Sequence, residues 1–171
     1  MPRLSLWRVT GEDNAYKAFT GKGAADSGGR WNKKGTPVVY AADSLAAATL
    51  EFLAYVQSPS ALNTRIYFRV EVDEDAVLEL ARDALPSDWN ALPYPRSTQR
   101  LGSGWVAEMA SVGLRVPSVL VPETYNVVLN PLHPDFGQAV SYEGPFPLKL
   151  DKRIASLVKL AFEGGEPGIS D

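Results

Sequence analysis

Cysteine is absent from this chain of 171 residues, and histidine occurs once, at position 133. Without cysteine there is no disulfide framework, no thiol nucleophile and no thiolate ligand for a metal ion. A single histidine excludes metal sites built from several histidines, and a serine–histidine triad would have to include His133. The chemistry is therefore expected to depend on carboxylate, arginine, hydroxyl and aromatic groups, with no metal and no true cofactor.

Long apolar runs are also lacking, since none reaches the roughly 18 residues that a membrane-spanning helix needs. The first residues do not form the apolar core of a signal peptide. The formal net charge of -3 argues against the broad basic surface of a nucleic-acid-binding protein. We expect a cytoplasmic protein with one domain over residues 1–171, a frayed tail over about 164–171, and no membrane or direct nucleic-acid partner.

Apolar residues recur with the spacing of a strand in some segments of the chain and with the spacing of a helix in others. Residues 66–72 alternate between apolar and polar side chains, which predicts a strand with one buried face. Alternation over 4–9 and an apolar run over 37–41 predict two more strands, and further strands are expected over 118–121, 126–129 and 148–154. Helical spacing predicts two main helices, over 45–57 and 97–112, the second capped by Ser97 and stopped by Gly113. This order predicts an α+β fold, a single compact domain with a central mixed, mostly antiparallel sheet and flanking helices.

The most informative segment is Gly28-Gly29-Arg30-Trp31-Asn32, at the end of a glycine-rich stretch over residues 11–35. Such a long irregular segment is typical of a binding loop. Its arginine can offer a rigid five-donor fork to a phosphate or a carboxylate. The alternative is an ordinary glycine turn with a surface charge.

Glu51 follows shortly afterwards in an alanine-rich helix, about 100° around the axis from the core residue Phe52. The small neighbours Ala47 and Ala48 allow a ligand or another element to approach closely. A solvated surface glutamate is the alternative, although exposed helix faces usually carry more charge than this one.

These features resemble the RES-domain family, the toxin half of many bacterial toxin–antitoxin pairs. The arginine, glutamate and serine that give the family its name match Arg30, Glu51 and Ser118. One departure is Ser103, where an acidic residue is expected. Further matching pieces, covering roughly residues 5–136 in order, are Trp7-Arg8-Val9, Pro37-Val38-Val39-Tyr40, Leu85-Pro86-Ser87-Asp88-Trp89 and Asn130-Pro131-Leu132-His133-Pro134-Asp135.

The resemblance implies a fold similar to diphtheria-toxin-like ADP-ribosyltransferases, an activity that consumes NAD+, and a partner antitoxin with a helix-turn-helix DNA-binding domain. Cleavage of the nicotinamide–ribose bond passes through an oxocarbenium-like transition state, as in glycoside hydrolysis. Nicotinamide leaves as a neutral molecule, so no general acid is needed and one carboxylate can suffice. Glu51 is the candidate for that carboxylate.

Arg30 and Tyr40 are further catalytic candidates that also bind the substrate, and Trp31 and Ser118 are candidates for binding alone. Arg30 suits the pyrophosphate, and Tyr40 offers a ring to nicotinamide and a hydroxyl to orient it. Ser118 can donate to a phosphate or ribose oxygen, and Trp31 either stacks on substrate or anchors the loop by packing. We interpret His133 as a structural hydrogen-bonding residue.

The acceptor of the ribosyl group stays open from the sequence. Water gives hydrolysis, inorganic phosphate gives phosphorolysis, and a side chain of a host protein gives ADP-ribosylation. The proline-rich stretch 86–96 is a candidate docking loop for such a protein. A non-enzymatic nucleotide-binding module is a further alternative, which the joint presence of Arg30, Tyr40, Glu51 and Ser118 argues against.

Overall fold

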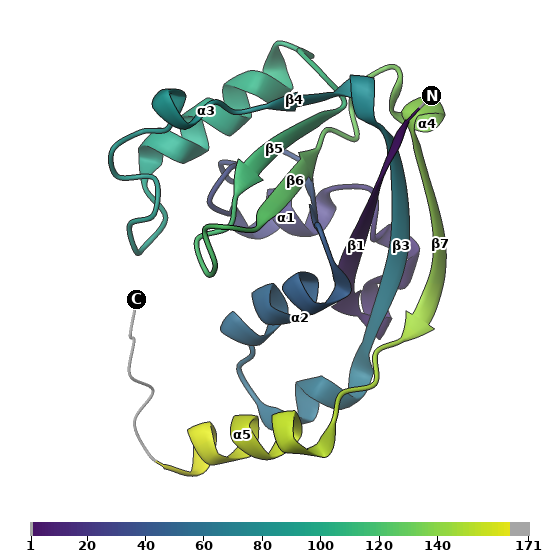
Figure 1. Cartoon of the computed structure of the whole chain (residues 1–171), viewed down its shortest axis with the longest axis vertical. Coiled ribbons are helices and arrows are strands. Elements are labelled where there is room, and N and C mark those ends of the chain that lie inside the picture. Colours follow the sequence, from purple (N-terminus) through teal and green to yellow (C-terminus); the bar gives the residue numbers. More distant parts are fainter. Residues whose placement is uncertain (1, 165–171) are drawn as a thin grey trace.

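A seven-stranded sheet runs through the protein in the order β4-β5-β6-β2-β1-β3-β7 (Figure 1). The computed structural model describes residues 2–164. Within that range only β4 and β5 pair in parallel, so the predicted mixed, mostly antiparallel sheet of an α+β fold is confirmed. The strands are β1 (Arg3–Gly11), β2 (Val39–Ala42), β3 (Arg65–Asp73), β4 (Val77–Glu79), β5 (Gly113–Pro117), β6 (Tyr125–Leu129) and β7 (Val140–Pro147).

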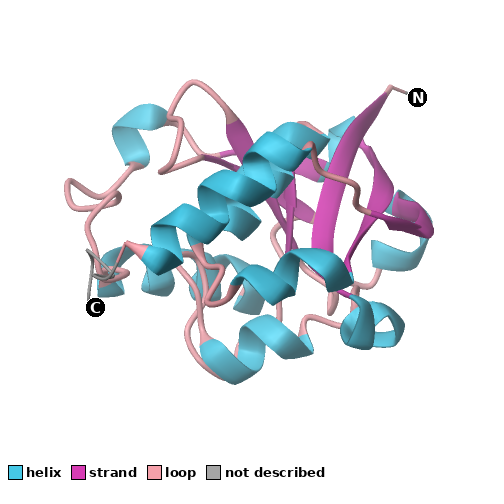
Figure 2. Ribbon diagram, turned by 90° about the horizontal axis from the view of Figure 1, so that it is seen from below, coloured by secondary structure: helices cyan, strands magenta, loops and turns pink. Residues whose placement is uncertain are grey.

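The helices lie beside this twisted layer of strands (Figure 2). They are α1 (Lys22–Ser27), α2 (Leu45–Ala54), α3 (Arg96–Ala107), α4 (Phe136–Ala139) and α5 (Lys152–Glu163). Short 3-10 turns are η1 (Glu12–Lys17), η2 (Pro59–Thr64), η3 (Glu74–Ala76) and η4 (Arg82–Ala84). The stretch 11–35 is therefore not a bare loop, because η1 and α1 divide it.

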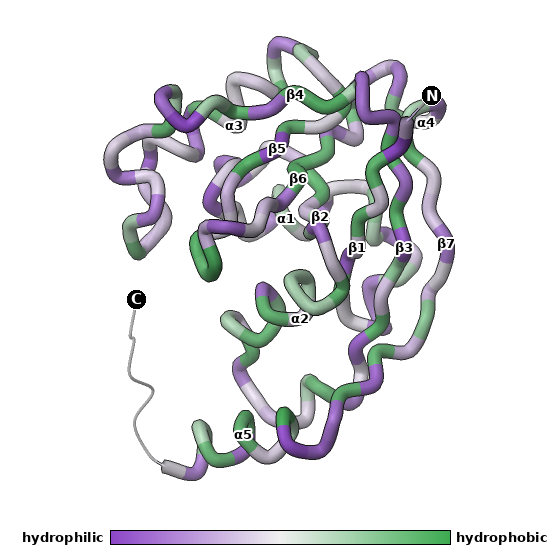
Figure 3. The backbone as a smooth tube through the Cα atoms, in the orientation of Figure 1, coloured by the Kyte–Doolittle hydropathy of each residue, from purple (hydrophilic) through white to green (hydrophobic). Residues whose placement is uncertain are grey.

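Hydrophobic side chains cover both faces of the sheet. Val127 and Leu129 of β6 belong to one buried cluster, with Phe68 of β3, while Val128 belongs to a second cluster with Trp105 of α3. Successive side chains of a strand point to opposite faces, so the two clusters lie on opposite sides of the sheet. The hydrophobic colour along the central strands in Figure 3 reflects this double burial.

Both predicted main helices exist, but both end earlier than expected. Helix α2 stops at Ala54 rather than near residue 57. Pro59 disfavours helical geometry at Ser58, which is extended, so the chain must leave the helix before that point. Helix α3 stops at Ala107, and Met109 just beyond it has a left-handed φ of 49°. Its N-cap is Pro95, so the prediction of a cap at Ser97 was wrong.

Two predicted strands were wrong. Strand β5 ends at Pro117, and residues 118–121 form a turn in which Ser118 Oγ accepts hydrogen bonds from the amides of Leu120 and Val121. Residues 148–154 hold the start of α5, because Asp151 caps that helix by accepting from Arg153 N at 2.8 Å. The edge strand β7 was missed because it is mostly exposed and because Gly144, Pro145 and Pro147 interrupt its pattern. Of the predicted frayed tail, Gly164 caps α5, and residues 165–171 lie outside the described residues.

Helix α3 and the Arg30 segment approach each other with no side chain between them. Gly102 is buried in the helix, and a Cβ built on it would overlap the backbone carbonyl of Trp31. Beside this contact, Gln99 Nε2 donates to Gly29 O at 3.0 Å and Ser103 Oγ accepts from Lys33 N at 2.9 Å. The serine that stands where an acidic residue was expected therefore holds the end of the segment.

Gly102→Ala is expected to lower the free energy of unfolding by about 3 kcal/mol or more, because the backbone of Trp31 cannot yield without moving the segment. Gly104→Ala in the same helix is the matched control. Nothing lies within 4 Å of its added Cβ, so it should raise stability by about 0.5–1 kcal/mol. Urea unfolding of both variants measures the difference, and equal effects would show that the close approach is not rigid.

Candidate functional site

A cavity of about 390 Å³ opens between β1, β2, α2 and the loops that face them. This size is within the range of ligand-binding clefts. Arg30, Trp31, Tyr40 and Glu51 all lie on its wall, so four of the five predicted site residues line one space. The fifth, Ser118, lies behind the wall and touches Glu51.

The Arg30 segment is a tight turn with an isolated bridge between Gly29 and Asn32. Gly29 N donates to Asn32 O at 3.0 Å. A Cβ on Gly29 would come within 2.8 Å of Tyr40 Oη, so the position requires glycine for close approach rather than for its backbone angle. The turn therefore sits directly against the tyrosine ring.

Buried Asn32 joins this turn to its surroundings. Its Nδ2 donates to Ala24 O at 2.8 Å and to Thr36 O at 3.0 Å, and its Oδ1 accepts from Tyr40 Oη at 2.6 Å. Tyr40 Oη in turn accepts from Trp31 N at 3.1 Å. Burial raises the pKa of the Tyr40 phenol, so the hydroxyl keeps its proton and directs it to Asn32. The hydroxyl thus holds the turn, while the ring faces the cavity.

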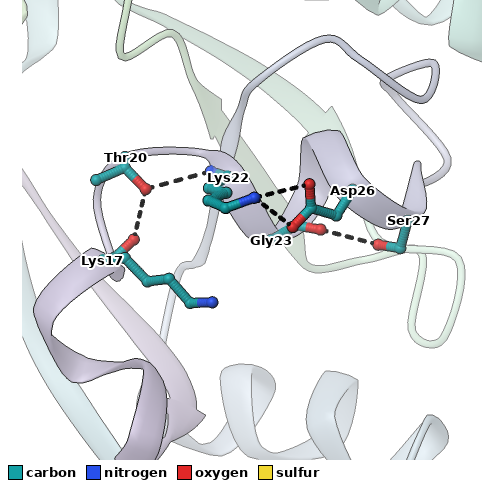
Figure 4. A network of polar contacts seen from close by, with 6 residues as sticks. All are labelled: Lys17, Thr20, Lys22, Gly23, Asp26 and Ser27. Carbon is teal, nitrogen blue, oxygen red and sulfur yellow. Dashed lines mark hydrogen bonds and ion pairs between the residues drawn. The ribbon is translucent and has the colours of Figure 1, made fainter.

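The preceding segment is held by short-range polar contacts (Figure 4). Thr20 Oγ1 donates to Lys17 O and accepts from Lys22 N, and Lys22 forms an ion pair with Asp26 across one turn of α1. An exposed pair of this kind contributes little to stability. Its effect is local, because it orders the helix that leads into the Arg30 turn.

Arg30 is 8% exposed, and one half of its guanidinium is used by the protein. Nη1 donates to the carbonyls of Trp89 and Ala91, both at 2.8 Å, and the group lies 5.3 Å from the ring centroid of Tyr94. Neither Nε nor Nη2 has a hydrogen-bond partner among residues 2–164. The proline-rich stretch therefore orients the arginine and leaves its other donors for a ligand.

Glu51 is half-buried and fixed through one oxygen. Oε1 accepts from Ser118 Oγ and from Asn126 Nδ2, each at 2.8 Å, whereas Oε2 has no partner in the described part of the chain. Both donors are neutral, so the carboxylate is oriented without losing its charge to a cation. This arrangement excludes the alternative of a solvated surface glutamate.

Asn126 was missed by the sequence reasoning. It is the second residue of β6, next to the buried residues Val127 and Val128, and a polar amide in such an apolar strand was the available signal. The hydroxyl of Ser118 can donate one hydrogen bond, and it donates it to Glu51 Oε1, so Ser118 acts on the cavity through that carboxylate. Its direct contact with a substrate stays a prediction.

Trp31 is 3% exposed and packs with Trp105 in the second cluster, which supports its role as an anchor of the turn. Stacking on a substrate stays a prediction for the part of its ring that reaches the cavity wall.

His133 lies elsewhere, beside Asp135, and its Nδ1 accepts from Asp135 N at 3.1 Å. This hydrogen bond agrees with the interpretation of His133 as a structural residue.

Among residues 2–164 no cluster of three or more histidine, aspartate or glutamate side chains has the geometry to hold a metal ion. No helix in the same range has both the length and the apolar character needed to cross a membrane.

Comparison with known proteins identifies the family. Residues 5–151 match the RES domain, and the chain belongs to this family. It is 34% identical over 151 residues to a protein named Toxin Res from Yersinia enterocolitica, covering 88% of this chain and 99% of that protein. It is 37% identical over 157 residues to Toxin Res from Photorhabdus laumondii, covering 91% and 100%.

A third relative is the Prs ADP-ribosylating toxin of Sphingobium sp., 39% identical over 136 residues, covering 77% of this chain and 84% of the relative. Among solved structures, the M. tuberculosis MbcT–MbcA toxin–antitoxin complex contains a similar chain. The TM-score is 0.69 at 22% identity, with 92% of this chain and 88% of the other covered, which shows a shared fold.

Asn126→Asp is expected to place a second carboxylate against Glu51. Repulsion between the two carboxylates, while both are ionised, should lower the free energy of unfolding by about 1–3 kcal/mol. Protonation of one of them removes the repulsion, so the deficit should shrink as the pH falls towards 4. Asn63→Asp, an exposed change of equal charge in η2, should show no such trend. Urea unfolding between pH 4 and pH 8 checks this, and a deficit that does not vary with pH contradicts the contact.

Proposed function

We propose that this protein is the toxin of a toxin–antitoxin pair and that it cleaves the nicotinamide–ribose bond of NAD+. The observation that carries the proposal is the state of Glu51. One carboxylate oxygen is held by two neutral donors, and the other is left to a cavity that also presents the unused donors of Arg30. The names of its relatives support the toxin role.

The reaction needs little more than this geometry. The bond between the ribose C1′ and the nicotinamide nitrogen breaks, and its electron pair stays on nitrogen, so nicotinamide departs neutral. The ribose carbon becomes cationic, and the free oxygen of Glu51 stabilises that charge in a partly apolar site. An attacking water then forms the new C1′–O bond and releases its proton to solvent, whereas inorganic phosphate forms the bond through one of its own oxygens.

Transfer to a host protein is the second candidate, and one relative is named an ADP-ribosylating toxin. The first half of the reaction is identical, and only the acceptor differs. The stretch that was considered a docking loop lies at the site, since Leu92 and Tyr94 line the cavity. An acceptor side chain would reach the ribose past these residues.

The antitoxin partner rests on the family and on the solved complex of the similar chain. A segment of the partner that carries an acidic group would compete with the substrate for the open donors of Arg30. In this proposal the partner has the helix-turn-helix domain, because the toxin chain with its net charge of -3 is poorly suited to hold DNA.

Glu51→Gln is expected to reduce turnover of NAD+ by about 10²- to 10³-fold while leaving the fold intact, because it removes the charge and keeps the shape. Purified protein is incubated with NAD+, with and without phosphate, and products are resolved by mass. Free ADP-ribose indicates hydrolysis, phosphorylated ADP-ribose indicates phosphorolysis, and a mass gain on protein indicates transfer. Glu143→Gln, exposed on β7, is the control. Near-normal turnover by Glu51→Gln would contradict the proposed role of Glu51 in stabilising the ribosyl cation.

Arg30→Lys should raise the KM for NAD+ by about tenfold or more although the charge is kept. An ammonium group cannot donate to the carbonyls of Trp89 and Ala91 and also present a planar fork to a phosphate. Arg100→Lys on the exposed side of α3 controls for the substitution type. Steady-state kinetics decide the question, and an unchanged KM would make Arg30 a purely structural residue.

A further inference from the structure

A second arginine lines the cavity, and the reaction outlined above does not use it. Arg8 lies in the middle of β1, opposite Phe68 of β3. Its Nε donates to Ala18 O at 2.8 Å and its Nη1 to Tyr40 O at 3.0 Å. Burial lowers the pKa of Arg8 to about 10, so the guanidinium still carries its charge at neutral pH.

Arg8 has no acidic partner in the range 2–164, where its only hydrogen-bond acceptors are the two backbone carbonyls. Cations with little solvent contact are normally paired with an acidic group, whereas the partly buried Arg8 is held by neutral carbonyls alone. Within the same range only Arg65 Nε and Arg115 Nε are both buried and without a hydrogen-bond partner, so the free Nη2 of Arg8 is reached by solvent. Arg8 also forms part of the cavity wall, which makes this nitrogen a candidate donor to a ligand there.

The charges of the cavity wall also favour an anionic ligand. Arg8 and Arg30 supply two positive charges and Glu51 one negative charge, so the wall carries one net positive charge in a chain of net charge -3. Glu51 is bound by Ser118 and Asn126 and forms no ion pair with either arginine. Both guanidinium groups therefore remain free to bind an anion.

The side chain and backbone of one residue, Tyr40, link Arg8 to the turn that carries Arg30. Arg8 Nη1 binds the backbone carbonyl of Tyr40, whereas the hydroxyl at the far end of the same side chain binds Trp31 N, directly after Arg30. Tyr40 thus connects Arg8 with the turn that carries Arg30, and both arginines line the same cavity. Neighbouring phosphates of a diphosphate carry two charges that such a pair of guanidinium groups can share.

We propose that Arg8 is a second phosphate-binding residue, which together with Arg30 forms a site for the diphosphate group of a dinucleotide. The identity of the dinucleotide as NAD+ rests on the proposed function, but the affinity for a nucleoside diphosphate does not. The site takes ADP-like ligands in preference to nucleosides without phosphate.

The competing explanation is that Arg8 only ties η1 to β2 through its two carbonyl contacts. Three variants separate the roles. Arg8→Met keeps the length and removes all donors, whereas Arg8→Lys keeps the charge and loses the fork. Arg69→Met removes a cation from the exposed side of the neighbouring strand β3, outside the cavity, and serves as the control.

Calorimetric binding of ADP and of adenosine to each full-length protein tests the proposal. Arg8→Met should weaken ADP binding by about 10- to 100-fold, the loss of charged hydrogen bonds to one phosphate, with adenosine affinity unchanged. Arg8→Lys should give a smaller loss confined to ADP, and it decides the question if Arg8→Met does not fold. Unchanged ADP affinity, or equal loss of ADP and adenosine, would overturn the proposal.

NAD+ kinetics on the same proteins keep the two proposals separate. If the wild type cleaves NAD+, Arg8→Met should raise KM by a larger factor than it lowers kcat, and Arg69→Met should change neither. If the wild type leaves NAD+ intact yet loses ADP affinity in Arg8→Met, the proposed function fails and the diphosphate site stands. A fall in kcat at constant KM would contradict a binding role for Arg8.

Discussion

The close approach of helix α3 to the backbone of Trp31 is the constraint on which the site depends. Gly102 allows the helix to lie directly on the segment, and Gln99 and Ser103 fix it on either side. The turn in this position presses Gly29 against Tyr40 and places Arg30 at the cavity wall. The packing of α3 against the Trp31 backbone therefore determines where Arg30 lies on the cavity wall.

The charge presented by the cavity wall depends on the hydrogen-bond partners of its two arginines and of Glu51. Backbone carbonyls hold both arginines, and a hydroxyl and an amide hold Glu51. Direct pairing of Glu51 with either cation would have cancelled the charge that each is proposed to offer a ligand. Neutral partners fix the geometry and preserve the field, which is the preorganisation that charge-stabilising sites require.

Much of this site could be predicted because its main parts are close in sequence. Arg30, Tyr40 and Glu51 lie within one turn–strand–helix unit, so local pattern and the family resemblance were enough to bring them together. Asn126 and Arg8 were missed because their roles arise from pairing of distant strands. An asparagine in β6 and an arginine in β1 look ordinary until β2 is placed between them.

The fold was predictable where one buried face leaves a periodic pattern of apolar residues, as in β3. Segments without such a pattern could not be predicted. Strand β7 is an exposed edge, and its glycine and two prolines resemble a loop more than a strand. The segment after β5 is apolar at Val119, Leu120 and Val121, yet the hydroxyl of Ser118 takes two of its amides and turns the chain. Local side-chain hydrogen bonds overrode a hydrophobic run that resembled a strand.

Helix α5 stands apart from the rest of the domain. The RES match ends at residue 151, one position before the helix begins, and α5 packs mainly against η2 (Figure 1). Leu157 and Leu160 are more than 60% exposed, so little apolar surface ties the helix to the sheet. With so little buried apolar surface, the helix is expected to open at a lower free-energy cost than the strands of the sheet.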